Sequence, residues 1–202
     1  MKHQTRLAVA GLLSAVALTA AACGGAGGDA GNNQGDKGGA SSGMVMKDDK
    51  YSDERFIDAM VPHHEGAVEM AEVALKNAEH EEIKQLSENI VSTQRTEIEE
   101  LKEIKQEEFG TSKVPMNMDS GQMEDMGVMA DAQELAKQDP FDKAFIDAMT
   151  PHHQSAIEMA EVAREKSQTP RIKKLADDIV SAQEKEISQM QTWRENWYPE
   201  DN

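Results

Sequence analysis

The chain carries the segment FIDAMVPHH at residues 56–64 and repeats it as FIDAMTPHH at residues 145–153. The similarity extends from Phe56–Ile104 to Phe145–Trp193 at a constant offset of 89 residues, with 24 identities in 49 positions and no gap. A match of this length indicates an internal duplication. Any structure formed by the first copy is therefore expected again in the second.

Each copy has the apolar periodicity of two amphipathic helices. On a helical wheel, the apolar side chains of the first helix gather around Met60, while acidic residues such as Glu69 lie on the opposite side. Thr169 followed by Pro170 is typical of a helix start. One helical hairpin cannot bury its apolar stripe, so two duplicated hairpins predict an all-α four-helix bundle. The predicted helices span 53–78, 81–108, 141–167 and 170–197.

The composition excludes several classes of protein. The formal net charge of −17 argues against nucleic-acid binding, which requires a basic surface. A single cysteine in 202 residues excludes an internal disulfide framework and a thiolate-rich zinc or iron–sulfur site. Aromatic residues make up only 4 % of the chain, which is too few for a typical β-sandwich or barrel.

The N-terminal residues have the pattern of an export signal. Lys2 and Arg6 precede an uncharged apolar run that is too short to span a membrane. The sequence LTAAAC, which ends at Cys23, resembles the lipobox of bacterial lipoproteins, where the cysteine carries the lipid. We therefore expect a signal peptide at residues 1–22, lipidation of Cys23 and an extracytoplasmic location at the cell membrane. A secreted protein with an incidental cysteine is the alternative.

The segment after Cys23 is rich in Gly, Ser, Asn and Asp and has no hydrophobic period. Such a segment buries too little apolar surface to fold by itself, so a flexible linker is expected up to residue 50. The expected organisation is a lipidated linker at 23–50 and a four-helix bundle at 51–198, with repeat one at 53–108, a methionine-rich connector at 110–139 and repeat two at 141–197.

Paired histidines lie on the apolar face of the first helix of each copy, and they are the first candidate site. Hairpin geometry places inward-facing Gln and Glu residues of the second helix at the same level. Buried polar groups need partners, so these side chains are expected to hold ligating imidazoles in position, or else to form a polar network that fixes the register of the bundle. The candidate ligands are His63, His64, His152 and His153, and the supporting residues are Gln94, Glu97, Gln183 and Glu186.

Methionine, with 13 residues, is unusually frequent, and two groups of methionines are candidate ligands. Met60 and Met149 precede the histidine pairs by one helical turn. Others occupy the polar connector, where core packing does not explain them. Thioether and imidazole ligands together suit copper, and thioethers select Cu(I). Met side chains that pack a loop onto the bundle are the alternative. The connector methionines are Met116, Met118, Met123, Met126 and Met129.

The M-x-P-H-H blocks, the Gln-x-x-Glu on each following helix and the methionine-rich connector ending in Phe141-Asp142-Lys143 resemble the bacterial secreted family known as domain of unknown function 305. The resemblance covers about residues 51–197. It implies a ferritin-like fold of two repeats of two helices. Some members are associated with copper binding in the bacterial envelope, so the resemblance also implies a metal-binding role.

Three functions are consistent with the sequence. The first is a lipid-anchored, extracytoplasmic, non-enzymatic protein that binds copper, or another transition metal, through Met and His. The second is an envelope interaction or scaffold lipoprotein without a metal, which fully hydrogen-bonded histidines would favour. The third is a ferritin-like di-iron oxidase. That site needs Glu-x-x-His motifs, whereas Met60 and Met149 stand three residues before His63 and His152.

Overall fold

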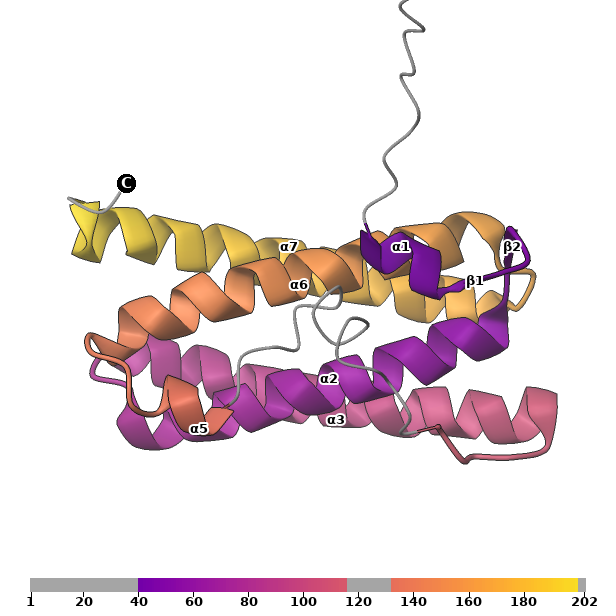
Figure 1. Ribbon diagram of the computed structural model, residues 1–202, viewed down its shortest axis with the longest axis horizontal. Helices are drawn as coiled ribbons and strands as arrows, with labels where there is room; N and C mark the ends of the chain where they lie inside the picture. Colours follow the sequence, from indigo (N-terminus) through magenta and orange to yellow (C-terminus); the bar gives the residue numbers. More distant parts are fainter. Residues whose placement is uncertain (1–39, 116–131, 200–202) are drawn as a thin grey trace, which may run out of the picture. The chain divides into compact units, whose positions relative to one another are not determined.

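Four long helices form the bundle that the duplicated sequence predicts (Figure 1). The computed structural model describes residues 40–115 and 132–199. Each helix ends within one residue of its expected position, and the all-α four-helix fold is confirmed. The helices are α2 (Asp53–Asn77), α3 (Glu81–Phe109), α6 (Phe141–Lys166) and α7 (Pro170–Trp197).

Local sequence signals explain several helix ends. The Ser52 side chain accepts a hydrogen bond from the backbone N–H of Arg55 and so caps α2. Gly110 ends α3 with φ 73°, a left-handed conformation that glycine adopts without strain. Pro170 occupies the first turn of α7, where its missing N–H costs no hydrogen bond. Because the hairpin loops are short, α2 lies antiparallel to α3 and α6 lies antiparallel to α7 (Figure 1).

Contacts between the hairpins also follow the duplication. Asp142, at the start of α6, accepts hydrogen bonds from the backbone N–H groups of Glu79 and His80 at 3.0 and 2.8 Å. Its counterpart Asp53 accepts one from the Thr169 hydroxyl at 2.8 Å. Each carboxylate therefore satisfies donors at the start of the second helix of the opposite hairpin, which holds the two hairpins in register.

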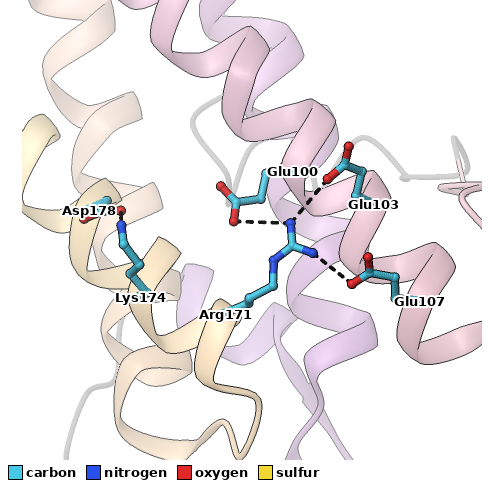
Figure 2. A network of polar contacts seen from close by, with 6 residues as sticks. All are labelled: Glu100, Glu103, Glu107, Arg171, Lys174 and Asp178. Atoms are coloured by element: carbon cyan, nitrogen blue, oxygen red, sulfur yellow. Dashed lines mark hydrogen bonds and ion pairs between the residues drawn. The ribbon is translucent and has the colours of Figure 1, made fainter.

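An exposed ion-pair network links the second helices of the two hairpins. The guanidinium group of Arg171 on α7 contacts three glutamates of α3 at 3.5, 3.3 and 2.8 Å, namely Glu100, Glu103 and Glu107 (Figure 2). These side chains are largely solvent-accessible, so the network contributes modestly to stability. The contact has no counterpart in the other half, because position 82, which corresponds to Arg171, is a glutamate.

The apolar core consists of two clusters, one toward each end of the bundle. The first contains Phe56 and Leu101 and is built from the start of α2, the end of α3, the end of α6 and the start of α7. The second contains Phe145 and Met190 and uses the opposite halves of the same helices. In each of the four long helices, polar residues occupy the stretch between the two clusters. We call this set the polar layer: His63, His64, Gln94, Glu97, His152, His153, Gln183 and Glu186.

The expectation of a flexible linker up to residue 50 is wrong for residues 40–50. These residues form a short helix α1 (Ala40–Met44) and a two-stranded hairpin of β1 (Met46–Lys47) and β2 (Lys50–Tyr51). The physical reason is the apolar run around Val45, which is fully buried against the first core cluster. Residues 24–39 of the expected linker lie outside the described residues.

The connector is described only at its ends. A short helix, α5 (Ala132–Leu135), buries Leu135 in the second core cluster. Residues 116–131, which include all five connector methionines, lie outside the described residues, as do Cys23 and the expected signal peptide. Within 40–115 and 132–199, no helix is both long enough and apolar enough to cross a membrane.

Candidate metal centre

Four histidine side chains meet at the centre of the bundle. His63 and His64 on α2, and His152 and His153 on α6, are each 0 % exposed. The rings of His63 and His152 are neighbours across the α2–α6 interface, with centroids 3.8 Å apart and planes tilted by 42°. The expectation that both pairs face the interior is confirmed. Metal binding by these histidines stays a prediction.

The outer ring of each pair contacts a glutamate of its own hairpin. Nε2 of His153 lies 2.7 Å from Oε2 of Glu186 and forms a hydrogen bond with it. In the other half, Nε2 of His64 lies 2.9 Å from Oε2 of Glu97, an ion-pair distance without the alignment of a hydrogen bond. Both expected His–Glu pairings are therefore present. Each carboxylate is placed to orient an imidazole and increase its basicity.

The two expected glutamines are buried in the polar layer, but they do not orient the histidines by hydrogen bonds. Gln94 is 3 % exposed and Gln183 is 2 % exposed. The side-chain oxygen of Gln94 and both amide atoms of Gln183 have no hydrogen-bond partner in the part of the chain that the structure describes. Burial of such atoms without a partner is unfavourable, so the polar layer has unused capacity to bind a polar ligand.

Ser155 is a residue of this site that sequence reasoning missed. Its hydroxyl donates to the backbone oxygen of His152 at 2.7 Å and lies 2.7 Å from Nε2 of His63. Because the single hydroxyl proton is used in the first bond, Nε2 of His63 must donate in the second. The lone pair of His63 is therefore at Nδ1. The available signal was position 155 itself, which is serine where the first copy has Gly66.

His152, like Gln183, is a buried group of the polar layer whose side-chain hydrogen-bonding atoms the described part of the chain leaves unsatisfied. Among the described residues, neither of its ring nitrogens has a hydrogen-bond partner, and Nδ1 of His64 and Nδ1 of His153 also lack one. Burial holds the pKa of His152 well below the usual value of 6.5, and His63, His153 and His64 act in the same direction. A contact with the backbone of His63 opposes them weakly. His152 is therefore neutral at physiological pH, the form in which imidazole binds metals.

Met60 and Met149 frame the polar layer from opposite sides. Both are fully buried, Met60 in the first core cluster and Met149 in the second. Each stands one helical turn before a histidine, and because α2 and α6 are antiparallel, the two thioethers lie toward opposite ends of the bundle. They add soft donors to a layer of nitrogen donors.

The donor set suits a soft ion better than a hard one. Among residues 40–115 and 132–199, no three side chains of His, Cys, Asp or Glu converge as a ready-made metal site. The polar layer nevertheless contains buried imidazole nitrogens without described hydrogen-bond partners, and thioethers lie beside it. These donors suit a soft metal ion with a low coordination number, which binds nitrogen and sulfur ligands. Of the carboxylates in the described ranges, Glu97 and Glu186 enter the polar layer, and each faces a histidine.

The pKa of His152 predicts a loss of stability in mild acid. Below about pH 6.5 the unfolded chain takes up a proton on this residue while the folded protein does not, so the free energy of unfolding falls as the pH falls. The expected slope is about 1.4 kcal/mol per pH unit for this one proton, until the folded-state pKa is reached. Urea unfolding with a metal chelator present, between pH 7 and pH 5, measures it.

The control for this prediction is His152→Gln, which keeps a polar side chain but cannot titrate. All other ionisable groups are common to both proteins, so the difference between the two pH profiles isolates His152. The variant should show the shallower profile. Parallel profiles would contradict the assignment of a neutral, buried His152.

Comparisons with known proteins agree with the fold. Residues 53–198 match the sequence profile of a family described as domain of unknown function (DUF305). A protein named CopM, solved in a Cu(I)-bound form, is 39 % identical, with a TM-score of 0.65 over 74 % of this chain and 99 % of CopM. Its Cu(II)-bound form is 41 % identical, with a TM-score of 0.67 and the same coverage.

Two further similarities carry less weight, one for its low identity and the other for its short coverage. A DUF305 fragment from Deinococcus radiodurans is 23 % identical, with a TM-score of 0.62 over 69 % of this chain and 93 % of the fragment, and supports the fold alone. Uncharacterized protein L153 of Acanthamoeba polyphaga mimivirus is 43 % identical over 49 residues, which is 24 % of this chain and 32 % of that protein. The chain thus spans about a third of the length of that relative. Because the profile match covers the whole bundle, the chain belongs to the DUF305 family.

Proposed function

We propose that this protein binds copper, as Cu(I), in the polar layer, and that it is a copper-handling protein rather than an enzyme. The observation that carries the proposal is His152, a fully buried imidazole whose two ring nitrogens have no hydrogen-bond partner within residues 40–115 and 132–199. Burial of a polar group without a hydrogen-bond partner lowers the stability of the folded protein, and a bound ligand would offset this loss. The solved CopM structures, with Cu(I), Cu(II) and Ag bound, support copper as that ligand.

Each residue type has a distinct role in this proposal. His63 and His152 are the central ligands, since their rings are adjacent across the α2–α6 interface. Glu97 and Glu186 orient the outer histidines of the two pairs. Met60 and Met149 supply thioethers that favour Cu(I), and the connector methionines capture the ion or pass it on.

The alternatives explain less of what is observed. A purely structural polar network should be fully hydrogen-bonded, whereas His152 and Gln183 have side-chain atoms that no described residue hydrogen-bonds. A di-iron oxidase would need a carboxylate-rich site, whereas two glutamates enter the polar layer.

Metal analysis tests the proposal. The protein is purified after growth with copper, zinc and iron supplied together and is then analysed by mass spectrometry for all three. We expect copper in excess of the other two, because imidazole and thioether without thiolate favour it. Iron or zinc as the main metal, or no metal above the background of a protein of similar charge, would overturn the proposal.

We also propose that the bundle is held at the outer face of the cell membrane by lipid on Cys23. The LTAAAC motif supports this location. The variant Cys23→Ser is expected to appear in the soluble fraction or to accumulate unprocessed, because stable anchoring requires the acyl chains. Membrane fractionation followed by detergent-phase partitioning measures the change. Membrane association equal to that of the native protein would contradict the anchor.

A further inference from the structure

Residues 40–51 pack across one end of the bundle, and we call them the strap. The strap contains α1, β1 and β2, and α1 lies against α6 (Figure 1). Its anchor is Val45, which is 0 % exposed and whose backbone oxygen accepts a hydrogen bond from the Ser52 N–H at 3.0 Å. A second bond, from Nε of Arg55 to the backbone oxygen of Met44 at 3.2 Å, holds the strap over the start of α2.

Two methionines flank the anchor of the strap. Met44 and Met46 are partly exposed, and both pack against the first core cluster. Because Val45 makes the fully buried contact, either methionine can change rotamer while the strap stays in place, and the unbranched side chain has three rotatable bonds with which to do so. Each of the two side chains is therefore reachable from solvent while it contacts the core.

Two buried methionines continue inward from the strap. Met159 stands seven residues after His152 on α6, and Met60 stands three residues before His63 on α2. Because these helices are antiparallel and both methionines belong to the first core cluster, both lie on the strap side of the paired rings. At 1.5 Å per residue, their axial distances from the rings are about 10 Å and about 5 Å.

Met44 lies at nearly the same level as Met159. The residue that holds it, Arg55, stands eight residues before His63 and is therefore about 12 Å from the paired rings by the same count. Since α1 also contacts α6, the thioethers of the strap and of Met159 lie at the same corner of the bundle.

In the described part of the chain, the opposite end of the bundle has buried methionines but no partly exposed pair. Met149 and Met70 occupy the positions equivalent to Met60 and Met159. The short helix that packs at that end, α5, buries Leu135 and contains no methionine. Among the described residues, the partly exposed thioethers are therefore specific to the strap.

We propose that Met44, Met46 and Met159 form a second binding site, for a soft monovalent metal ion such as Cu(I), at the outer end of this series of thioethers. Thioether sulfurs select Cu(I), whereas leucine at the same positions would pack as well and supply no donor. Thioethers bind without losing a proton, unlike groups that must first be deprotonated. The site is distinct from the polar layer, so its test does not depend on the proposed function.

Carbon-13 NMR of the methionine methyl groups, with Ag⁺ added as a diamagnetic probe of soft-ion binding, tests the site in the native protein. We expect the methyl resonances of Met44, Met46 and Met159 to shift together. Met70, which is equivalent to Met159 at the other end of the bundle, is the matched internal control and should shift little. Histidine nitrogen-15 resonances, recorded in the same titration, follow the polar layer separately.

Substitutions make the test specific. The variant Met44→Leu/Met46→Leu should bind about one Ag⁺ fewer per chain, because leucine keeps the approximate volume of methionine and removes the donor. The methyl resonances of Val45 should stay unchanged, which shows that the strap is still docked. Met70→Leu makes the same chemical change outside the series and should leave the Ag⁺ stoichiometry as in the native protein.

The outcomes separate the strap site from the proposed function. If the buried histidines respond while Met44 and Met46 do not, or if their double variant binds as much Ag⁺ as the native protein, the strap site is wrong and the proposed function stands. A shift of Met70 as large as that of Met159 would also overturn the strap site, because buried methionines would then respond in general. If the strap methionines respond and the buried histidines do not, the strap site stands and the proposed function fails.

Discussion

A variant with alanine at His63, His64, His152 and His153 is expected to lose the copper whose binding depends on pH. Replacing even the groups that support metal ligands commonly weakens binding by about 10- to 100-fold, so removal of the imidazoles themselves should exceed about 100-fold. The native protein should lose this copper as the pH falls through about 6, because a protonated imidazole cannot bind it. Competition with a chromophoric Cu(I) chelator between pH 5 and pH 8 measures both effects.

The matched control replaces the connector methionines instead of the histidines. Met→Leu changes at 116, 118, 123, 126 and 129 should remove a fraction of copper whose binding changes little with pH, because thioethers do not titrate in this range. Equal copper stoichiometry in the native protein and both variants would leave the metal-binding account without support.

The second large effect is on stability, and it has the opposite sign to that of most core substitutions. The variant His152→Leu is expected to be more stable than the native protein without metal, by about 2 kcal/mol. Leucine has a similar volume to histidine and removes two buried ring nitrogens that have no hydrogen-bond partner among the described residues. Thermal and urea unfolding in the presence of a chelator measure the difference.

His80→Leu is the control for this comparison. His80 donates to the buried carboxylate of Asp142, so its replacement removes a satisfied hydrogen bond and should reduce stability by about 1–2 kcal/mol. Destabilisation of the His152→Leu protein by a similar amount would show that the polar layer is a structural network and not a site maintained for a ligand. The same variant also shows the loss of copper without a large cavity.

The sequence was sufficient to predict the bundle because the fold depends on periodicity and duplication. Each helix needed only its apolar stripe and its ends, and the offset of 89 residues located the second hairpin from the first. The level at which Glu97 and Glu186 meet the histidines followed from counting residues on both sides of a short hairpin turn. Helix periodicity and residue spacing within one hairpin are local properties, so they can be determined from the sequence.

The contacts between hairpins could not be predicted in the same way. His63 meets Ser155 across 92 residues, and the pairing depends on how α2 and α6 cross, which periodicity alone does not determine. The hydrogen bonds from the α3 N-terminus to Asp142 also join the two hairpins, so they too depend on how the hairpins pack against each other. Residues 40–50 are ordered because apolar side chains near Val45 pack against the bundle, and the sequence does not show which surface they contact.

Anomalous scattering at the copper edge from crystals of the copper-loaded protein tests the central claim most directly. We expect a peak within the polar layer, between the rings of His63 and His152, at imidazole–copper bonding distance from at least His152. Copper peaks confined to acidic residues on the outside of the bundle, with the polar layer unchanged, would contradict it.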